Sequence, residues 1–391
     1  MTVFNDGERP RGGGPWLIWS IPLILSLCGL VMIASLSLRN SMTGGAPYAQ
    51  IVKQFLFFVS GLVLMSACAF SSLRTLRRWS FLLWILALFL LVGTLIPGLG
   101  VRVGGARRWL DLRWVRFQPL EFLLLAVPLF LADRLEQSQR GGFQVFLRPT
   151  VMVMSLSILP LLFQPNLGGT ILVTLICLMM HVENRGWRYP LLGGAFMVAI
   201  FAFLTLLEPY RMRRFLAFWD PWSDPMNKGF QIIQGLVAFC NGRFFGVGIG
   251  KGLQEDEYLP AAQTDYIFPA IGEEFGLVGT LFLLSLYAVW TIRAYRIYRR
   301  CPNPFLSVLT LGLTTSIIGP MFINVGGVMK LMPLTGIPLP FVSAGGSAML
   351  FMWAKVGILM NINRIASREE EREGKREGKR PGGRNGFVNG E

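Results

Sequence analysis

Long apolar runs recur between residues 15 and 362 of this 391-residue chain. A helix needs about 20 apolar residues to cross the hydrocarbon core of a bilayer, and many of these runs are that long. Charged residues make up 15% of the chain, whereas an average soluble domain carries about 25%. The runs predict an all-α, polytopic integral membrane protein with about ten transmembrane helices. The expected spans are residues 15–38, 51–71, 79–97, 117–135, 148–164, 167–183, 188–207, 266–292, 304–329 and 339–362.

The distribution of arginine predicts the orientation of these spans. Ten spans, an even number, place both termini on the same side of the membrane. The loops on that side are rich in arginine. Positive loop residues favour the cytoplasmic side, so we expect both termini to be cytoplasmic. The expected domains are a cytoplasmic N-terminal segment at 1–14, a ten-helix membrane domain at 15–364 and a disordered, charged cytoplasmic tail at 365–391. The membrane domain includes one large extracytoplasmic loop, 208–265, before the eighth span.

Cysteine spacing and charge placement argue against several kinds of site. The 5 cysteines are scattered without a CxxC pair, so we expect neither a disulfide framework nor a protein metal site. The net charge of +15 lies mostly in short loops between spans, so no nucleic-acid partner is expected. The glycine run 246–252 lacks the strand and helix that flank a dinucleotide fingerprint. Its backbone N–H groups and Lys251 remain a candidate cradle for a diphosphate.

Two loops on the predicted outer side carry basic residues against the usual bias. Residues 98–116 contain Arg102, Arg107, Arg108, Arg113 and Arg116, and the 208–265 loop includes Arg211. Two interpretations stay open: these cations bind an anionic partner such as a diphosphate, or they contact lipid headgroups. Membrane lipids are expected neighbours in either case. Within the long loop, the apolar spacing of residues 230–239 predicts an amphipathic helix on the membrane surface.

Ionisable residues inside or at the ends of spans are costly and therefore candidates for function. Asp265 opens the eighth span, where Thr264 or Asp265 could simply cap the helix. Glu121 opens the fourth span, and the structural alternative is a pair with Arg116 or Arg108. For Glu274 and Lys355, farther into their spans, the favoured interpretation is an ion pair between two helices.

Five stretches together resemble one family. The stretches are GARRWLDLRWVRFQPLEF (105–122), QPNLGGT (164–170), RMRRFLAFWDPWSDPMNKGFQIIQGL (211–236), GVGIGKGLQEDEYLPAAQTDYIFPAIGEEFG (246–276) and NVGGVMKLMPLTGIPLPFVSAGGSAML (324–350). Their order and the long loop before the eighth span are similar to the SEDS family (shape, elongation, division and sporulation), which includes FtsW, RodA and SpoVE. The IGEE form resembles the FtsW branch more than RodA.

The resemblance implies a peptidoglycan glycosyltransferase that polymerises lipid II on the outer face of the bacterial cytoplasmic (inner) membrane. It also implies a class B penicillin-binding protein as transpeptidase partner, and other division or elongation proteins. The family's essential aspartate matches Asp265. The expected substrate-binding residues are Arg108, Trp109, Arg116, Glu121, Arg211, Lys251, Thr264 and Ser343. No cofactor is required by this comparison, although the diphosphate of the substrate is compatible with bound Mg or Mn.

Four positions depart from the family pattern. Gln263 stands where a His is typical, Leu124 where a Lys is common three residues after the Glu, Asn166 where an Asp is common, and Ala344 where a Tyr is common. These departures put any role of the missing groups in doubt for this chain.

The residues support a specific hypothesis for the chemistry. Asp265 is the general base for the acceptor hydroxyl, and the basic residues hold the departing diphosphate. Two other functions compete with this one. One is a transporter that flips lipid II along a path lined by Glu273, Glu274 and Lys355. The other is a non-catalytic scaffold that recruits a transpeptidase.

Overall fold

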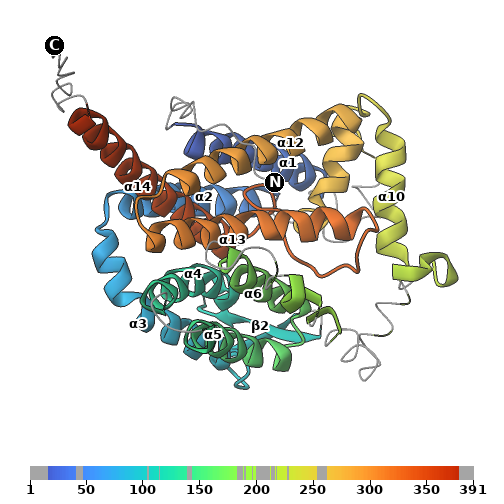
Figure 1. Ribbon diagram of the computed structural model, residues 1–391. Coiled ribbons are helices and arrows are strands. Elements are labelled where there is room, and N and C mark those ends of the chain that lie inside the picture. Colours follow the sequence, from blue (N-terminus) through green and yellow to red (C-terminus); the bar gives the residue numbers. More distant parts are fainter. Residues whose placement is uncertain are drawn as a thin grey trace, which may run out of the picture.

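The computed structural model describes residues 16–40, 47–103, 105–113, 115–138, 143–182, 218–226, 229–252 and 262–377, with short pieces between 188 and 216. Most of these residues form helices that run alongside one another (Figure 1). The helices are α1 (Leu17–Asn40), α2 (Pro47–Phe70), α3 (Leu73–Gly93), α4 (Pro119–Ser138), α5 (Phe143–Phe163), α6 (Leu167–Met179), α10 (Phe230–Gly242), α12 (Ile267–Arg300), α13 (Pro304–Val328) and α14 (Gly346–Glu377).

Five of the described helices are long and apolar enough to cross a membrane. They comprise residues Leu17–Ser37, Tyr48–Phe70, Leu73–Gly93, Ile267–Arg300 and Pro304–Val328. The expectation of an all-α, polytopic membrane fold is confirmed. The count of ten spans stays a prediction, because most of the expected span 188–207 lies outside the described residues.

Close helix packing forms a continuous core. Helix α14 packs along α2 and also contacts α4, whereas α13 packs against α4, α6 and α12. The bulky side chains of Trp84, Trp290 and Trp353 are fully buried between helices. At Gly357 a Cβ atom would lie 2.3 Å from the carbonyl oxygen of Met65. A glycine therefore lets α14 approach α2 this closely, as small residues do in membrane bundles.

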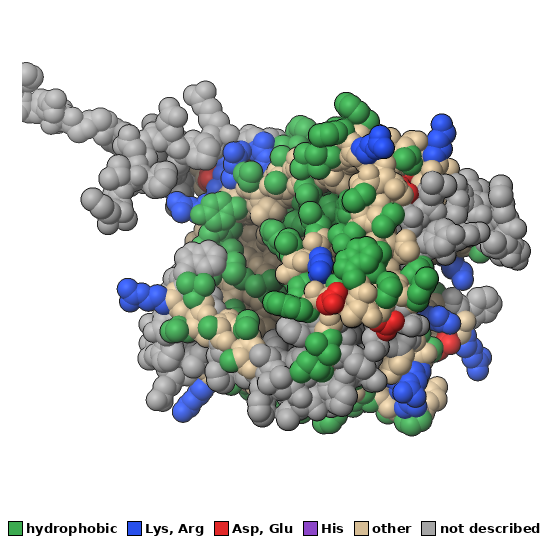
Figure 2. Space-filling view, turned by 90° about the vertical axis from the view of Figure 1, so that its right-hand side faces the viewer, with side chains coloured by type: hydrophobic (Ala, Val, Ile, Leu, Met, Phe, Trp, Pro, Cys, Tyr) green, Lys and Arg blue, Asp and Glu red, His purple; other side chains and the backbone are tan. Residues whose placement is uncertain are grey.

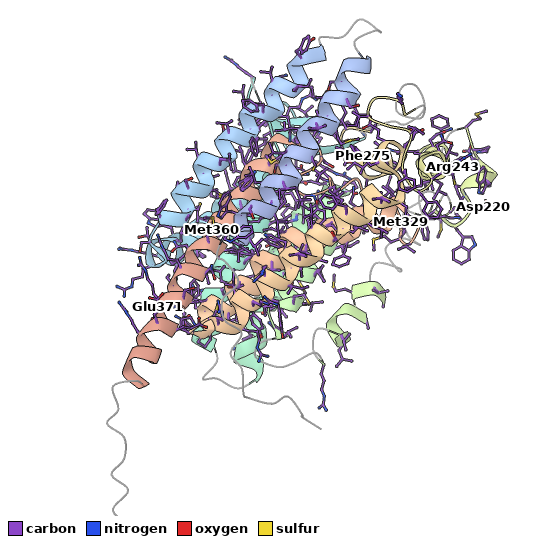
Figure 3. The ribbon with its side chains drawn as sticks, turned by 90° about the horizontal axis from the view of Figure 1, so that it is seen from above. Asp220, Arg243, Phe275, Met329, Met360 and Glu371 are labelled. Atoms are coloured by element: carbon purple, nitrogen blue, oxygen red, sulfur yellow. The ribbon has the colours of Figure 1, made fainter. Side chains whose placement is uncertain are left out.

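The two ends of the bundle differ. Helix α10 stands across one end, and the C-terminal part of α14 projects beyond the other (Figure 1). Figure 3 shows the same separation, with Arg243, Phe275 and Met329 at the α10 end and Met360 and Glu371 at the opposite end. We call the end that carries α10 the α10 end. The starts of α4, α6, α12 and α14 are linked there by the contacts described below.

A small sheet interrupts the helices between α3 and α4. Its strands are β1 (Gly100–Val103), β2 (Ala106–Asp111) and β3 (Arg116–Phe117), paired antiparallel in the order β1-β2-β3. Alternating apolar residues in this arginine-rich segment give it a period of two, which suits a strand rather than a helix. The sheet is an addition to the all-α fold expected from the apolar runs.

The C-terminal tail departs from the expectation of disorder. Helix α14 continues beyond residue 364 to Glu377, so the first part of the expected tail is helical. An ion pair of 3.3 Å between Arg300, the last residue of α12, and Glu370 supports this extension. Residues 378–391 lie outside the described residues.

Candidate active site

Asp265 lies in a turn, residues 262–266, that leads directly into α12. The carboxylate-bearing residue is half-buried, whereas the next residue, Tyr266, is fully buried. Tyr266 is the N-cap residue of α12 and no side-chain capping hydrogen bond forms there. The alternative in which Thr264 or Asp265 is the N-cap is therefore wrong.

Helix α13 and the loop after it hold the Asp265 turn in place. The Asn324 side chain donates one hydrogen bond to the backbone oxygen of Asp265 (2.8 Å) and another to that of Ile337 (2.7 Å). Between these anchors lies Gly336, with φ +72°; a Cβ there would stand 3.2 Å from Asp265 Oδ2. A glycine suits this left-handed backbone and leaves room for the carboxylate.

The segment before α14 forms hydrogen bonds with the same turn. The Ser343 hydroxyl donates to the backbone oxygen of Thr264 and accepts from Leu339 N–H at 2.8 Å. The Ala344 N–H donates to the backbone oxygen of Gln263 at 2.8 Å. The hydroxyl of Ser343 is thus buried and used within the protein. It positions the backbone of Thr264 next to Asp265, and its role in substrate binding stays a prediction.

The start of α6 packs against the loop at residues 335–337. Asn166 is the N-cap of α6 and its side-chain oxygen accepts from Gly169 N–H at 3.1 Å. A Cβ on Gly168 would lie 2.6 Å from a methyl group of Ile337, so the helix start packs directly against the 335–337 loop. Asparagine is a good N-cap, which explains why Asn166 serves here although aspartate is common in the resembling sequences.

Arg108 connects the sheet to the start of α6. It lies on β2, and its guanidinium donates to the backbone oxygen atoms of Gln164 and Pro165. Gln164 is itself buried and donates to Leu91 O (2.9 Å) and Thr94 Oγ1 (2.7 Å) at the end of α3. The guanidinium is therefore held by a fixed framework. A contiguous series of contacts runs from Arg108 through the α6 start and the 335–337 loop to Asp265.

The other sheet residues predicted for the site lie farther along the same element. Trp109 is half-buried on β2 and pairs with Val101 of β1. Arg116 is exposed on β3, and its backbone oxygen accepts a long hydrogen bond (3.5 Å) from Ser347 at the start of α14. The Ser347 hydroxyl also accepts from Gln118 N–H at 3.0 Å. The start of α14 thus holds the junction between β3 and α4.

Two predicted pairings of buried charges are wrong. Glu121 is 5% exposed and forms no ion pair with Arg116 or Arg108 in the described part of the chain, where one of its carboxylate oxygens has no hydrogen-bond partner. Lys355 is 0% exposed and donates to Ser316 O of α13 at 3.3 Å. Glu274, the expected partner of Lys355, instead accepts from the Ser35 hydroxyl of α1 at 2.6 Å. The helices present these side chains to neighbours that sequence order does not reveal.

The glycine run 246–252 is anchored to α12. Val247 N–H donates to Glu273 O (3.0 Å), Gly248 N–H to Glu274 O (3.0 Å), and Gly250 N–H to Glu274 Oε1 (2.7 Å). These donors are already occupied, so the expected diphosphate cradle built from them is contradicted. Lys251 is exposed at the end of this loop and stays a candidate for binding an anion.

A kink in α12 explains why the loop docks there. Gly276 has non-helical angles, with φ +67° and ψ −163°, which breaks the helix ladder and frees carbonyl groups one turn earlier. The N–H groups of Val247 and Gly248 satisfy two of these carbonyls. Glu273 accepts from the Asn241 side chain of α10 at 3.0 Å, so both acidic residues of this pair hold neighbouring elements together.

The α10 end presents a mixed surface. Figure 2 looks onto this end: hydrophobic side chains gather in the middle with Lys or Arg among them and Asp or Glu below them, further Lys and Arg lie around the rim, and the surface is hollowed beside the central patch. Such a face suits a ligand with an apolar chain and an anionic head. Within the described residues, no group of three or more His, Cys, Asp or Glu side chains could hold a metal ion. Arg211, another predicted binding residue, lies outside the described residues.

Several residues that build the site were not found from sequence. Asn324 and Ser347 tie the Asp265 turn and the β3–α4 junction to the helices behind them. Their only signal is a polar residue at the edge of an apolar run. Gly336 gave a clearer signal, because a glycine between a threonine and Ile-Pro indicates a turn.

Comparison with known proteins agrees with this arrangement. Residues 15–368 match the family model of FtsW, RodA and SpoVE, described as cell cycle protein. The chain belongs to the FtsW/RodA/SpoVE family. Stage V sporulation protein E of Bacillus subtilis is 36% identical over 352 residues, covering 89% of this chain and 96% of that protein. The probable peptidoglycan glycosyltransferase FtsW of Thioalkalivibrio sulfidiphilus is 37% identical over 360 residues, covering 89% and 88% of the two chains.

Solved structures of this family share the fold. A chain from a peptidoglycan synthase complex, described as coordinating polymerization and crosslinking, superimposes with a TM-score of 0.74 at 28% identity, covering 90% of this chain and 98% of that one. The rod shape determining protein RodA of Thermus thermophilus superimposes with a TM-score of 0.67 at 24% identity, covering 89% and 96%. The sequence-based recognition of the family is therefore confirmed.

Proposed function

We propose that this protein is a peptidoglycan glycosyltransferase that polymerises lipid II on the outer face of the cytoplasmic membrane. One observation carries the proposal: Asp265 is held in a turn fixed by Asn324 and Ser343, and a series of contacts links this turn to Arg108 on the sheet. A buried framework of this kind can place a base and a cation at a constant separation. Relatives named as probable peptidoglycan glycosyltransferases support the same function.

The proposed chemistry is a single displacement at a sugar carbon. Asp265 accepts the proton of the acceptor 4-hydroxyl as its oxygen bonds to the anomeric carbon of the donor. The bond from that carbon to the lipid diphosphate breaks, and the diphosphate leaves with the electron pair. Attack opposite the leaving group inverts the configuration. The half-buried position of Asp265 leaves it accessible to a polar head group.

Positive charge is needed where the diphosphate departs. Arg108 offers the pre-organised guanidinium, because the 164–165 carbonyls already fix part of its side chain. Arg116 and Lys251 are exposed at the same end and supply further charge. Arginine matches phosphate oxygens with two parallel donors, whereas lysine acts as a point charge. A divalent cation carried by the diphosphate itself is compatible with this proposal.

The proposed topology places the α10 end outside the cell. Arginines gather at the opposite end, where Arg77 pairs with Asp133 (2.6 Å) and Glu136 (2.6 Å). Loops rich in arginine favour the cytoplasm, which puts both termini inside. The likeness to a chain of a synthase complex that coordinates polymerization and crosslinking supports a transpeptidase partner, which we take to be a class B penicillin-binding protein.

The contacts of the buried charges do not favour the transport alternative. Glu273 and Glu274 hold Asn241, Ser35 and the glycine loop, whereas Lys355 donates to the backbone oxygen of Ser316. The three residues are therefore engaged with separate partners. A path for a charged head group along them would require these contacts to open.

The proposal is tested with purified protein, its transpeptidase partner and lipid II, with glycan strands separated by electrophoresis. We expect strands from the wild type and at least about 100-fold less product from Asp265→Asn, the lower end of the range for loss of a general base. Asp220→Asn is the matched control, because the Asp220 carboxylate accepts from Trp222 N–H in a short turn at the same end. Near wild-type synthesis by Asp265→Asn would refute the base assignment, and lipid II flux into liposomes without polymer would favour the transporter.

A further inference from the structure

A basic pocket lies between the start of α3 and the end of α4. Its volume is about 330 Å³, within the range of roughly 300–1,000 Å³ that is usual for small-molecule sites. Its lining includes one carboxylate, that of Asp133, and four arginines, which are Arg74, Arg77 and Arg78 of α3 and Arg134 of α4. Near the start of α3, Ser71 O accepts from Asn361 of α14, one residue after Met360, so the pocket lies at the end opposite α10 (Figure 3).

One arginine uses the carboxylates of this pocket. Arg77 pairs with Asp133 (2.6 Å) and with Glu136 (2.6 Å). Its guanidinium also lies 4.8 Å from the centre of the Phe305 ring of α13, and the face of an aromatic ring attracts a cation. Arg77 is therefore held in one position by three neighbours. Four positive and two negative side chains leave the pocket with two positive charges in excess.

The other three arginines are available to an anion. Arg134 lies over the Phe130 ring at 5.0 Å and donates a long hydrogen bond to Gln137 at 3.4 Å. Arg74 and Arg78 are exposed. Within the ranges that the structure describes, none of the ion pairs involves these three arginines. Charge alone keeps a loop in the cytoplasm, whereas unpaired guanidinium groups around a common cavity indicate a site for an anionic ligand.

An apolar face continues from the pocket along α3. It begins at Phe81, which lines the pocket, and its members are between 41% and 72% exposed: Phe81, Leu82, Ile85, Leu86 and Phe89. Residues with this spacing share one side of a helix. Helix α3 is long and apolar enough to cross a membrane. A ligand with an anionic head and apolar chains fits both parts, whereas a free phosphate ion fits the pocket alone.

We propose that the pocket at Arg74, Arg78 and Arg134 binds the phosphate of an anionic phospholipid whose acyl chains lie along α3. A guanidinium group donates to two phosphate oxygens at once. The proposed topology places this end at the cytoplasmic leaflet, where anionic lipids give the surface a negative potential. The inference goes beyond the proposed function and stands even if the protein transfers no sugar.

The test compares two pairs of exposed arginines at the same end of the bundle. Full-length protein in detergent and about 0.15 M salt is titrated with phosphatidylglycerol, and the bound lipid is counted by native mass spectrometry. Arg74→Gln with Arg78→Gln removes two charges from the pocket. Arg296→Gln with Arg299→Gln removes two charges from the end of α12, outside the pocket.

The pocket variant is expected to bind phosphatidylglycerol at least about 10-fold more weakly than the wild type, because two charge-assisted contacts to the phosphate are lost. The α12 variant is expected to bind within about twofold of the wild type, because solvent and salt screen its charges from the bound phosphate. Equal losses in the two variants would show a general attraction to charge and overturn the proposal. Unchanged affinity in the pocket variant would overturn it as well.

Two further ligands identify the source of the phosphate. Glycerophosphoglycerol has the same head without acyl chains, and phosphatidylcholine has the same chains with a zwitterionic head. The wild type is expected to bind each at least about 10-fold more weakly than phosphatidylglycerol. Equal affinity for glycerophosphoglycerol would assign the pocket to a soluble phosphate compound, and equal affinity for phosphatidylcholine would leave the anionic charge without a role. Either result contradicts the proposal, and both need only the wild-type protein.

Discussion

Replacing Asn324 with alanine tests how Asp265 is held. The Asn324 side chain is 3% exposed and its amide nitrogen donates to Asp265 O at 2.8 Å and Ile337 O at 2.7 Å. Alanine leaves both carbonyl oxygens without this donor. At about 1–1.5 kcal/mol for each lost hydrogen bond, the free energy of unfolding is expected to fall by about 2–3 kcal/mol.

The effect on rate is expected to exceed the effect on folding. Without Asn324 the Asp265 turn and the Ile337 loop are no longer tied together, and a displacement of about 1 Å at a reacting group costs up to about 100-fold. We expect kcat for lipid II polymerisation to fall about 10–100-fold. Thermal unfolding in detergent, followed by tryptophan fluorescence, measures the stability of the same sample.

Asn361 provides a matched control at the other end of the bundle. It is 2% exposed and its amide nitrogen also donates to two backbone oxygens, those of Cys68 (3.2 Å) and Ser71 (2.6 Å). Asn361→Ala is expected to lose comparable stability while keeping kcat. Equal losses of kcat in both variants, or unchanged kcat in Asn324→Ala, would refute the claim that this amide positions Asp265.

Two further substitutions test the framework. Gly246 has φ +80° and a Cβ there would lie 2.1 Å from Glu274 O, so Gly246→Ala is expected to lower the free energy of unfolding by about 2–4 kcal/mol. The control is Gly98→Ala, where φ is +94° but the space around the glycine is open. This variant is expected to lose only about 1–2 kcal/mol of the free energy of unfolding in the same thermal unfolding assay. Equal losses in the two variants would contradict docking of the glycine loop. Arg108→Lys removes the guanidinium group that reaches the carbonyl of Pro165. Steady-state kinetics are expected to show a KM for lipid II that is about 10-fold higher. An unchanged KM would show that Arg108 is not part of the binding site.

The helices and the position of Asp265 could be predicted from sequence for a simple reason. Apolar runs of membrane length report helices almost directly, and the change from a polar loop to an apolar run at Thr264–Asp265 marks a helix start. The arginines of 98–116 stood out because they oppose the usual charge bias. These signals are local, so no tertiary contact was needed to read them.

The partners of the buried charges could not be predicted in this way. Which group Lys355 contacts depends on the rotation of α14 and on its neighbours, and the backbone oxygen that it reaches belongs to Ser316 on another helix, α13. The expected pair with Glu274 failed because Glu274 faces α1 and the glycine loop.

The contacts of the glycine run 246–252 could not be predicted from the sequence either. Its composition suggested free N–H groups, but the non-helical Gly276 exposes α12 carbonyls that take them up. A kink of this kind has no clear pattern in sequence, because a glycine inside an apolar run is common in membrane helices.

The most direct test of the catalytic role of Asp265 separates binding from turnover. Lipid II binding and single-turnover bond formation are measured on the same preparations of wild type and Asp265→Asn. We predict that the variant binds lipid II within about threefold of the wild type and forms the glycosidic bond at least about 100 times more slowly. Bond formation at the wild-type rate in Asp265→Asn, or a loss of activity explained entirely by lost binding, would contradict the account.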